Sequence, residues 1–449
     1  MAVYRFPDDF IWGAATASYQ IEGSPLADGA GESIWHRFSH TPGKVKNGDT
    51  GDVADDHYHR WAEDIELMRW LGLDAYRFSI AWPRLFPHDE KAFNERGFAF
   101  YDRLVDGLLA AGITPFVTLY HWDLPGWADD RGGWLTRDCA SWFADYASAV
   151  YDRLGDRVQH WITHNEPWVT AFLGYYTGEL APGHTDAGEA VTVSYNLLLS
   201  HGLALERFRG SGKKGEIGIT LNMSEAIPAS DSEADQRAAR LYDGFLNRWF
   251  IEPLTKGCLP QDVAAVFRQG GAVPPEPTAD DMAKISAPID FLGLNYYSVA
   301  TIKALDQFPG FRQQPPPDRP LNPMGWEIEP EGLRHLLLRL HNEYTPVPIY
   351  ITENGYPTFD GDKTGEALLE DQPRLDYIRD HLIACWRAMH EGVPLKGYFV
   401  WSLLDNFEWA QGYAARFGIV RVDYKTLERL PRASARWYRE VIEQNAVVV

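Results

Sequence analysis

Eight short runs of apolar, β-branched residues recur along this chain of 449 residues, and a longer amphipathic segment follows each of them. We expect strands at 10–20, 75–82, 114–122, 160–167, 216–225, 290–298, 348–355 and 396–406. Several runs, such as Thr-Pro-Phe-Val-Thr-Leu-Tyr at 114–120, are almost continuously apolar. This pattern is typical of strands that are buried on both faces of a parallel sheet. Parallel strands need crossover connections, so helices are expected between them.

The segments between the strands have helical spacing. We expect helices at 60–71, 97–111, 138–154, 187–208, 233–250, 330–343, 374–391 and 432–444. In the first of these, Trp61, Ile65 and Leu71 share one face, and Gly72 follows as a candidate C-cap. Eight β-then-α units predict the α/β class, with a single (β/α)₈ TIM barrel over residues 1–449. The alternative, a doubly wound open sheet, requires a Gly-rich phosphate turn, but no GxGxxG or GxxxxGKS/T motif occurs after the first strand.

Long Pro- and Gly-rich segments follow five of the predicted strands. They lie at 24–55, 120–134, 174–187, 299–329 and 402–418. In a barrel of this kind, the segments that follow strands form long βα loops at the C-terminal face, where barrel enzymes place their active sites. Such loops can also be tolerated insertions. That alternative does not account for the polar and aromatic residues at the strand ends that lead into them.

Two strand ends carry a carboxylate beside amide side chains. They are Thr-His-Asn-Glu-Pro at 163–167 and Ile-Thr-Glu-Asn-Gly at 351–355. A single Glu near a strand end is more often a solvated or ion-paired residue. Cleavage of a glycosidic bond, however, needs two carboxyl groups, one to protonate the leaving oxygen and one to meet the positive charge at the anomeric carbon. Glu166 and Glu353 are therefore the candidate catalytic pair.

The other predicted strand ends also carry polar or aromatic side chains. In chain order these are Gln20 and Glu22, Arg77, His121 and Trp122, Asn165, Asn222, Asn295 and Tyr297, and Trp401. Most of the 17 Trp residues are expected to fill a large core. Those at strand ends can instead stack on a sugar ring while neighbouring side chains bond its hydroxyl groups. The distribution predicts a sugar-binding site at the C-terminal face.

Seven ordered motifs across essentially the whole chain resemble family 1 glycoside hydrolases of the β-glucosidase type. Besides the two carboxylate motifs they are Ala-Thr-Ala-Ser-Tyr-Gln-Ile-Glu-Gly (15–23), Tyr-Arg-Phe-Ser-Ile-Ala-Trp-Pro-Arg (76–84), Leu-Tyr-His-Trp-Asp-Leu-Pro (119–125), Gly-Leu-Asn-Tyr-Tyr (293–297) and Trp-Ser-Leu-Leu-Asp-Asn-Phe-Glu-Trp (401–409). The resemblance implies a retaining β-glucosidase that acts on cellobiose, short cello-oligosaccharides and aryl or alkyl β-glucosides. It also implies side activity on β-galactosides and β-fucosides, and a place in cellulose degradation.

The resemblance assigns roles to individual residues. Glu166 would be the general acid and base, and Glu353 the nucleophile that forms a covalent glycosyl-enzyme. This mechanism requires carboxyl groups about 5–5.5 Å apart. Arg77, Asn295 and Tyr297 are expected beside Glu353, where they would keep it ionised and oriented.

A larger set is expected to bind the substrate. It consists of Gln20, His121, Trp122, Asn165, Asn222, Tyr297, Trp326, Trp401, Glu408, Trp409 and Phe417. By resemblance, Asn165 holds the 2-hydroxyl, Trp401 stacks on the sugar and Trp326 lies against the leaving group. Glu408 would accept from the 4- and 6-hydroxyls, which disfavours a 6-phosphate because two like charges would meet. Trp168 and Leu173 are further candidates at the entrance.

Three other functions compete with this one. A binding protein without catalysis should have lost one carboxylate, and both are present. A thioglucosidase would have an amide in place of the acid, and Glu166 argues against it. A β-galactoside or β-fucoside as the physiological substrate remains open, because the sequence does not fix the geometry around the 4-hydroxyl.

Composition limits the partners. The formal net charge of -21 is spread along the chain, so nucleic acid would be repelled over most of the surface. The first residues lack a signal-peptide pattern, and no apolar window approaches the roughly 20 residues of a membrane span. We therefore expect a cytoplasmic protein with a small-molecule glycoside as substrate and no membrane partner. The sequence does not indicate an oligomeric state.

Metal and disulfide chemistry are not expected. Cys139, Cys258 and Cys385 are odd in number and have no CxxC spacing, so buried free thiols are predicted. The run Asp-Asp-His-Tyr-His at 55–59 lacks the spacing of zinc ligands and is expected to hydrate the surface or cap a helix. We expect no metal and no cofactor.

Overall fold

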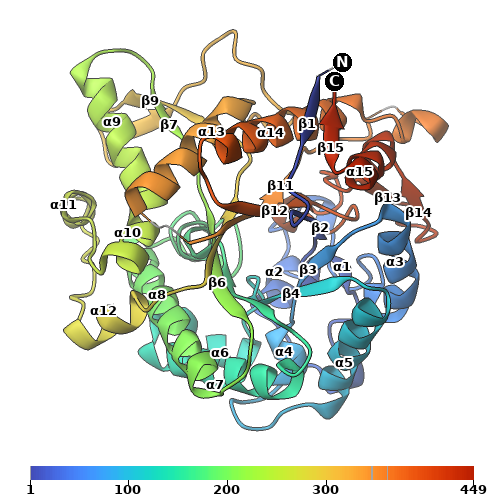
Figure 1. Cartoon of the computed structure of the whole chain (residues 1–449). Coiled ribbons are helices and arrows are strands. Elements are labelled where there is room, and N and C mark those ends of the chain that lie inside the picture. The colour runs from blue at the N-terminus through green and yellow to red at the C-terminus, as the bar shows by residue number, and fades with distance from the viewer. Residues whose placement is uncertain (1, 345–346, 362) are drawn as a thin grey trace.

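The computed structural model describes residues 2–344, 347–361 and 363–449 (Figure 1). Eight parallel strands close into a barrel in the order β11-β12-β2-β3-β4-β5-β6-β8. Their bounds are β2 Ile11–Ala15, β3 Ala75–Ser79, β4 Thr114–Tyr120, β5 His160–Asn165, β6 Glu216–Asn222, β8 Phe291–Asn295, β11 Ile349–Asn354 and β12 Leu395–Trp401. Each strand overlaps a predicted range, and the predicted (β/α)₈ TIM barrel is confirmed.

The barrel strands are buried because side chains fill the interior and helices cover the outside. Strands β3, β8 and β11 are buried at every residue. Inside the barrel the Phe116 ring of β4 lies 4.8 Å from the Phe399 ring of β12 and 5.4 Å from the Tyr350 ring of β11. Because β4 is a neighbour of neither β11 nor β12, these contacts cross the interior. The barrel is therefore a packed core.

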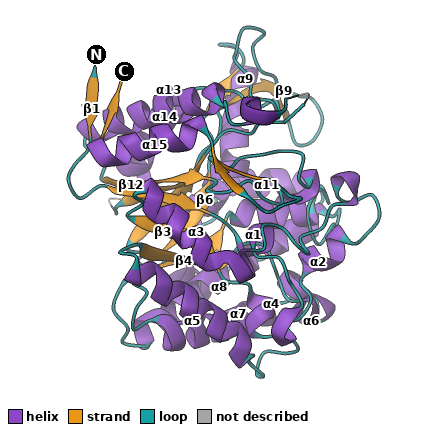
Figure 2. Cartoon of the chain, turned by 90° about the vertical axis from the view of Figure 1, so that its right-hand side faces the viewer, coloured by secondary structure: helices purple, strands orange, loops and turns teal. Residues whose placement is uncertain are grey.

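Helices surround the strands on the outside (Figure 2). The long ones are α3 His57–Leu71, α5 Glu95–Ala110, α7 Arg137–Leu154, α8 Ala187–Gly210, α9 Glu233–Asp243, α10 Trp249–Lys256, α13 Pro330–Arg339, α14 Gln372–His390 and α15 Ala433–Gln444. All eight predicted helices are present. Helix α3 ends at Gly72 in the left-handed conformation, as predicted. The predicted helix 233–250 is divided, because a π-helical turn separates α9 from α10.

Shorter elements lie in the connections. They are α1 Ser18–Ile21, α2 Ile34–Ser39, α4 Trp82–Leu85, α6 Gly126–Asp130, α11 Gln261–Gln269, α12 Ala279–Ile285, η1 Ala27–Gly29, η2 Lys46–Gly48, η3 Gly133–Leu135, η4 Val169–Leu173, η5 Gly244–Arg248, η6 Leu340–Tyr344, η7 Gly365–Leu368 and η8 Trp409–Gln411. The additional strands are β1 Val3–Arg5, β7 Ala226–Pro228, β9 Ala300–Ala304, β10 Phe311–Gln313, β13 Val420–Val422, β14 Arg429–Pro431 and β15 Ala446–Val448. β1 pairs with β15, so the two ends of the chain lie side by side (Figure 1).

All eight predicted ranges extend beyond the C-terminal ends of their strands. The strand expected at 10–20 ends at Ala15, and residues 18–21 form the helical turn α1. The Ser18 N–H donates a hydrogen bond to the Ser79 hydroxyl at 2.7 Å. It therefore does not pair with the backbone of a neighbouring strand. The strand expected at 396–406 ends at Trp401, and the chain then enters a loop. Local apolar pattern cannot locate the first of these ends, because a side chain from another strand contributes to it.

Two minor predictions are wrong in part. Cys139 and Cys385 are buried free thiols, but Cys258 is exposed. Asp55 and His57, expected at the surface, are buried, and His57 Nδ1 lies 2.7 Å from Asp64 Oδ2. In the part of the chain that the structure describes, no helix is long and apolar enough to cross a membrane.

Candidate active site

A cavity of about 580 Å³ opens at the C-terminal ends of the barrel strands. The predicted site residues that line it are Glu166, Glu353, His121, Trp122, Asn222, Asn295, Tyr297, Trp326, Trp401, Glu408, Trp409 and Phe417. Arg77, Gln20 and Asn165 are buried behind this lining and bond to it. The folded chain therefore brings the whole predicted set into one place.

Glu353 lies on β11 with 4% of its surface exposed. Arg77 Nη1 donates to its Oε1 at 2.7 Å, and the Tyr297 hydroxyl donates to its Oε2 at 2.6 Å. Burial raises the pKa of this carboxyl above its ordinary value, and Arg77 and Tyr297 oppose that shift. Both oxygens are thus held by donors that favour the carboxylate form. The two expected contacts with Arg77 and Tyr297 are present.

Glu166 directly follows β5 and has different surroundings. Its Oε1 accepts one hydrogen bond from Asn295 Nδ2 at 2.7 Å. Burial, and after it the negative charge of Glu353, raises the pKa of Glu166 to about 8. At neutral pH Glu166 therefore keeps its proton, while Glu353, with its guanidinium and phenol donors, is the first of the pair to ionise. Within this pair Glu166 is the proton donor and Glu353 the carboxylate.

Asn295 was expected beside Glu353 alone, but it also contacts Glu166, Asn165 and Thr352. Its Nδ2 donates to Glu166 and also to Asn165 Oδ1 at 3.0 Å, and its Oδ1 accepts from the Thr352 hydroxyl at 2.8 Å. Its amide also lowers the pKa of Glu353. Asn295 therefore interacts with both carboxyl groups, and the sequence does not show which of the two it would contact.

The hydrogen bonds of Asn165 fix the state of His121. Asn165 Oδ1 accepts from Arg77 Nη2 at 2.6 Å, so its Nδ2 is the atom that faces His121 Nε2 at 3.0 Å. An amide nitrogen only donates, so Nε2 accepts and the imidazole proton is assigned to Nδ1. Burial, and then the charge of Arg77, lowers the pKa of His121 well below its ordinary value. The Nδ1–H is buried without a partner in the described structure and is left for a ligand.

Gln20 and Glu408 form a second polar pair. Gln20 Nε2 donates to Phe407 O at 2.9 Å and to Asn406 Oδ1 at 3.1 Å, and Glu408 Oε2 lies 3.5 Å away. The Gln20 Oε1 is buried without a partner in the described contacts. Burial, together with the charge of Glu353, raises the pKa of Glu408 to about 8. An amide oxygen and a carboxyl group thus await hydroxyl donors.

Aromatic rings form two walls of the cavity. On one wall the Trp122 and Trp409 rings lie 4.6 Å apart. On the other, the Trp326 ring lies 5.6 Å from that of Tyr297 and 6.2 Å from that of Phe417. The flat apolar faces of these aromatic rings lie beside polar atoms that have no partner in the described contacts. Such a cavity suits a sugar ring, which has C–H bonds on its faces and hydroxyl groups around its edge.

Three lining residues have a strained backbone. Trp122, Glu166 and Trp409 have φ angles of 78°, 48° and 48°, although none of them is glycine. Such conformations cost about 1–3 kcal/mol each and persist where the surrounding contacts hold them. The Glu166 N–H bonds Thr220 O at 3.0 Å, and Trp122 Nε1 bonds Asn165 O at 2.9 Å. Three of the ten described non-glycine residues with a positive φ therefore face the cavity.

Sequence reasoning missed part of the outer cavity. The lining also includes Tyr242, Leu246, Gln313, Met324 and Ser224, which come from α9, a π-helical turn, β10 and loops. Trp168 and Leu173, expected at the entrance, line the cavity, as do Leu180 and Gln411. Of the missed residues, Ser224 follows the end of β6, Tyr242 and Leu246 lie in the range predicted as a helix at 233–250, and Gln313 and Met324 lie in the predicted loop 299–329. None of them belongs to a recognised motif. Only the folded loops bring them to the cavity.

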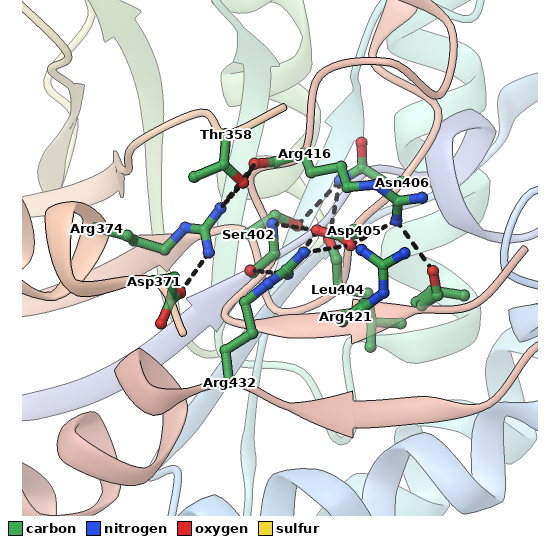
Figure 3. A network of polar contacts seen from close by, with 12 residues as sticks. Thr358, Asp371, Arg374, Ser402, Leu404, Asp405, Asn406, Arg416, Arg421 and Arg432 are labelled. Atoms are coloured by element: carbon green, nitrogen blue, oxygen red, sulfur yellow. Dashed lines mark hydrogen bonds and ion pairs between the residues drawn. The ribbon is translucent and has the colours of Figure 1, made fainter. Parts of the chain in front are cut away.

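A buried ion-pair network supports the segment between Trp401 and Trp409 (Figure 3). The fully buried Asp405 accepts from Arg432 Nη1 and Nη2, each at 2.8 Å, and from Arg416 Nη1 at 2.8 Å. Burial works against the ionised form, but Arg432 and Arg416 hold the pKa of Asp405 below its ordinary value. The network fixes the loop that carries Glu408.

Replacing Asp405 with asparagine should lower the free energy of unfolding by about 3–5 kcal/mol, since buried Arg432 loses the carboxylate it pairs with and Arg416 keeps only Asp360. Denaturant unfolding measures this. The control is Asp145→Asn, at an exposed carboxylate paired with Arg207 outside this network, where a loss of about 1 kcal/mol or less is expected. Equal losses in the two variants would contradict the prediction.

The same variant has a pH signature. Because the folded pKa of Asp405 is lowered, its contribution to stability is present above the ordinary value of 3.8 and is lost as the pH falls through the folded value. Asp405→Asn should therefore be less sensitive to acid in that window than the unaltered chain.

Comparisons with known proteins identify the family of this chain. The family model "Glycosyl hydrolase family 1" matches residues 3–447. The chain is 51% identical over 448 residues to β-glucosidase A of Thermotoga maritima, with 100% of both chains covered. It is 43% identical to a bifunctional β-D-glucosidase/β-D-fucosidase of Bifidobacterium breve, covering 98% of this chain and 99% of that one. A solved structure of the β-glucosidase from T. maritima in complex with deoxynojirimycin has a TM-score of 0.95, at 51% identity and 99% coverage of both chains. The chain belongs to glycosyl hydrolase family 1.

Proposed function

We propose that this protein is a retaining β-glucosidase in which Glu353 is the nucleophile and Glu166 the general acid and base. The observation that carries the proposal is the unlike setting of two buried carboxyl groups in one cavity. Glu353 is held by Arg77 and Tyr297, whereas Glu166 accepts from one amide and has a pKa raised to about 8. Environments that separate two pKa values in this way assign the acid and the base.

The reaction has two steps. In the first, the Glu353 carboxylate attacks the anomeric carbon, the bond to the aglycone oxygen breaks, and the proton of Glu166 passes to that oxygen. In the second, Glu166, now a carboxylate, takes a proton from water, and the resulting hydroxide oxygen attacks the anomeric carbon and releases Glu353. Two inversions give net retention, and the required carboxyl separation of about 5–5.5 Å stays a prediction.

The polar atoms left without partners point to the substrate class. The Nδ1–H of His121 donates, and the Oε1 of Gln20 accepts. Glu408 lies beside Gln20. We propose that these groups bind the hydroxyls of a terminal β-glucosyl residue, with Asn165 on the 2-hydroxyl and Trp401 under the ring. The B. breve relative is named for both glucosidase and fucosidase activity, which supports a β-fucoside side activity here.

A phosphate on the 6-hydroxyl should prevent turnover. It would be buried against Glu408, and no Lys or Arg lines this cavity in the described ranges. An unpaired buried charge costs several kcal/mol, so kcat/KM for a 6-phospho-β-glucoside should be at least about a hundredfold below that for the β-glucoside. Release of p-nitrophenol from the β-glucoside, β-galactoside, β-fucoside and 6-phospho-β-glucoside tests this. Preference for the phosphorylated sugar would overturn the assignment of Glu408.

Activity should depend on pH through both carboxyl groups. As the pH rises through about 8, Glu166 loses its proton and kcat/KM should fall. On the acid side kcat/KM should fall as Glu353 gains a proton, at a pH above the ordinary value of 4.5 because its pKa is raised. The two apparent values belong to the coupled pair. A profile without an alkaline limb would contradict the role of Glu166.

The natural substrate, the location and the domain organisation are also proposed. Cellobiose and short cello-oligosaccharides are the proposed natural substrates, which would place the enzyme in cellulose degradation. Glucose release from cellobiose, followed by chromatography, tests this directly. A cytoplasmic location and a single catalytic domain over 1–449 stay predictions, to be checked by cell fractionation and by limited proteolysis.

A further inference from the structure

Two histidines and an aspartate converge outside the catalytic cavity. His36 lies on α2, His40 directly follows that helix, and Asp52 lies in the loop before α3. His36 Nδ1 is 3.7 Å from Asp52 Oδ1, and His40 Nε2 is 3.1 Å from Asp52 Oδ2. The three candidate ligand atoms all lie within 4.8 Å of one another. Among the described residues, no other group of three or more His, Cys, Asp or Glu side chains meets this condition.

The hydrogen bonds around these groups leave lone pairs facing one another. His40 Nδ1 lies 2.7 Å from the backbone oxygen of His36, which can only accept, so the proton is assigned to Nδ1. In a neutral imidazole Nε2 then carries a lone pair, and it faces a carboxylate oxygen of Asp52. His36 Nδ1 is also buried without a hydrogen-bond partner in the described contacts. The contact between His40 Nε2 and Asp52 therefore needs a proton or a cation to be favourable, and His36 Nδ1 is free to take part.

A metal ion satisfies both contacts at once. Two imidazolium groups would repel each other, because the ring centroids of His36 and His40 are only 4.3 Å apart. In a tetrahedral zinc site, bonds of about 2.0–2.1 Å place ligand atoms roughly 3.3 Å from one another. The two histidine nitrogens lie 3.7 Å and 3.1 Å from different oxygens of Asp52, Oδ1 and Oδ2, and these distances fall on either side of that value. Two imidazole nitrogens and one carboxylate are a donor set that suits Zn²⁺.

We propose that His36, His40 and Asp52 bind Zn²⁺, with water as the fourth ligand. The side chains of His40 and Asp52 are 41% and 44% exposed, so the ion and its water have access from solvent. The catalytic mechanism does not use this site, and the proposal does not depend on the proposed function. It departs from the expectation of no metal, which was based on residues 55–59 and on strand-end spacing.

The position of the site indicates a structural role. Helix α2 carries Trp35, whose ring lies 4.4 Å from that of Trp409. On the Asp52 side, the Tyr413 hydroxyl donates to Thr50 O at 2.6 Å, and its N–H donates to Asp49 Oδ2 at 3.0 Å. The ion would join two segments that both pack against residues 409–413. Zinc should therefore raise the melting temperature and leave the chemical step unchanged.

The test is metal binding by the full-length protein after treatment with EDTA. Titration calorimetry with ZnCl₂ should show an ion bound at this site. His40→Ala or Asp52→Asn should weaken that binding by at least about tenfold, because replacing even a residue that only hydrogen-bonds to a metal ligand has an effect of this size. Co²⁺ in place of Zn²⁺ should give the visible absorption of a tetrahedral site, and His36→Ala should abolish it.

His184→Ala is the matched control. His184 also pairs with a carboxylate, Glu189, at 2.7 Å, but it belongs to no group of three such ligands in the described ranges. Zinc should raise the melting temperature of the unaltered chain and of His184→Ala, but not that of the triple variant His36→Ala, His40→Ala, Asp52→Asn. Circular dichroism without metal checks that the variants fold. Absence of zinc binding, or equal affinity in the triple variant, would overturn the proposal.

Discussion

Replacing Glu353 with alanine is expected to lower kcat on p-nitrophenyl β-glucoside by about 10⁴–10⁶-fold, the size seen when a catalytic nucleophile is removed. The variant keeps Arg77 and Tyr297, whose donors hold the carboxylate in place in the unaltered chain. It loses the atom that attacks the anomeric carbon. Added azide should occupy the vacated volume, restore release of p-nitrophenol and yield the α-glycosyl azide. The measurement is steady-state kinetics together with identification of the product's anomer.

The control for this prediction is another buried glutamate. Glu327 is 3% exposed and accepts from the Thr301 N–H and hydroxyl, both at 2.7 Å, outside the catalytic pair. Glu327→Ala should reduce stability and keep kcat within about tenfold. If azide gave no glycosyl azide with Glu353→Ala, or gave the β-anomer, Glu353 would not be the nucleophile.

Replacing Glu166 with alanine should have an effect that depends on the leaving group. For an alkyl glucoside, whose oxygen needs a proton to leave, kcat/KM should fall by about 10²–10⁴-fold. For 2,4-dinitrophenyl β-glucoside the fall in kcat/KM should be much smaller, because that phenol leaves without a proton. The alkaline limb near pH 8 should also become weaker, since Glu166 is gone and only Glu408, whose pKa is likewise raised to about 8, still titrates there. Kinetics over a series of aryl and alkyl glucosides measure both effects.

The two variants test each other through the azide product. In Glu166→Ala the nucleophile Glu353 remains, so the glycosyl-enzyme forms and azide attacks it from the opposite face. The product should then be the β-glycosyl azide, whereas Glu353→Ala should give the α-anomer. A uniform loss of activity over all leaving groups in Glu166→Ala would mean that Glu166 positions the substrate and does not donate a proton.

The barrel could be predicted because each of its strands has a recognisable pattern in the local sequence. A parallel strand buried on both faces reads as a continuous apolar run, and all eight runs formed strands. Their ends were less certain. Ser18 to Ile21 had the composition of a strand, yet they form a helical turn because Ser79 on the neighbouring strand bonds the Ser18 N–H. Such contacts join residues far apart in sequence, and local periodicity does not record them.

The outer cavity and the proposed metal site were missed for the same reason. Tyr242 of α9 and Gln313 of β10 both reach the cavity, although they are 71 positions apart. Gln313 Nε2 donates a hydrogen bond to the Tyr242 hydroxyl at 3.0 Å. His36 and His40 stand one helical turn apart, which is a signal, but no helix was expected there, and Asp52 joins them only in the folded loop. The sequence of a loop gives its residues, but it does not show which residues of other segments they will contact.

The sequence by itself determined the order of eight strands and the chemical groups at their C-terminal ends, because burial pattern and motif are local properties. It also determined that Glu166 and Glu353 face one site, since parallel strands of a closed barrel end at one rim. Only the tertiary structure decided how the two carboxyl groups differ. Arg77, 276 positions from Glu353, donates to it, whereas Glu166 has one amide donor and a pKa raised to about 8. A pKa depends on burial and on charges a few ångströms away, and folding alone supplies both.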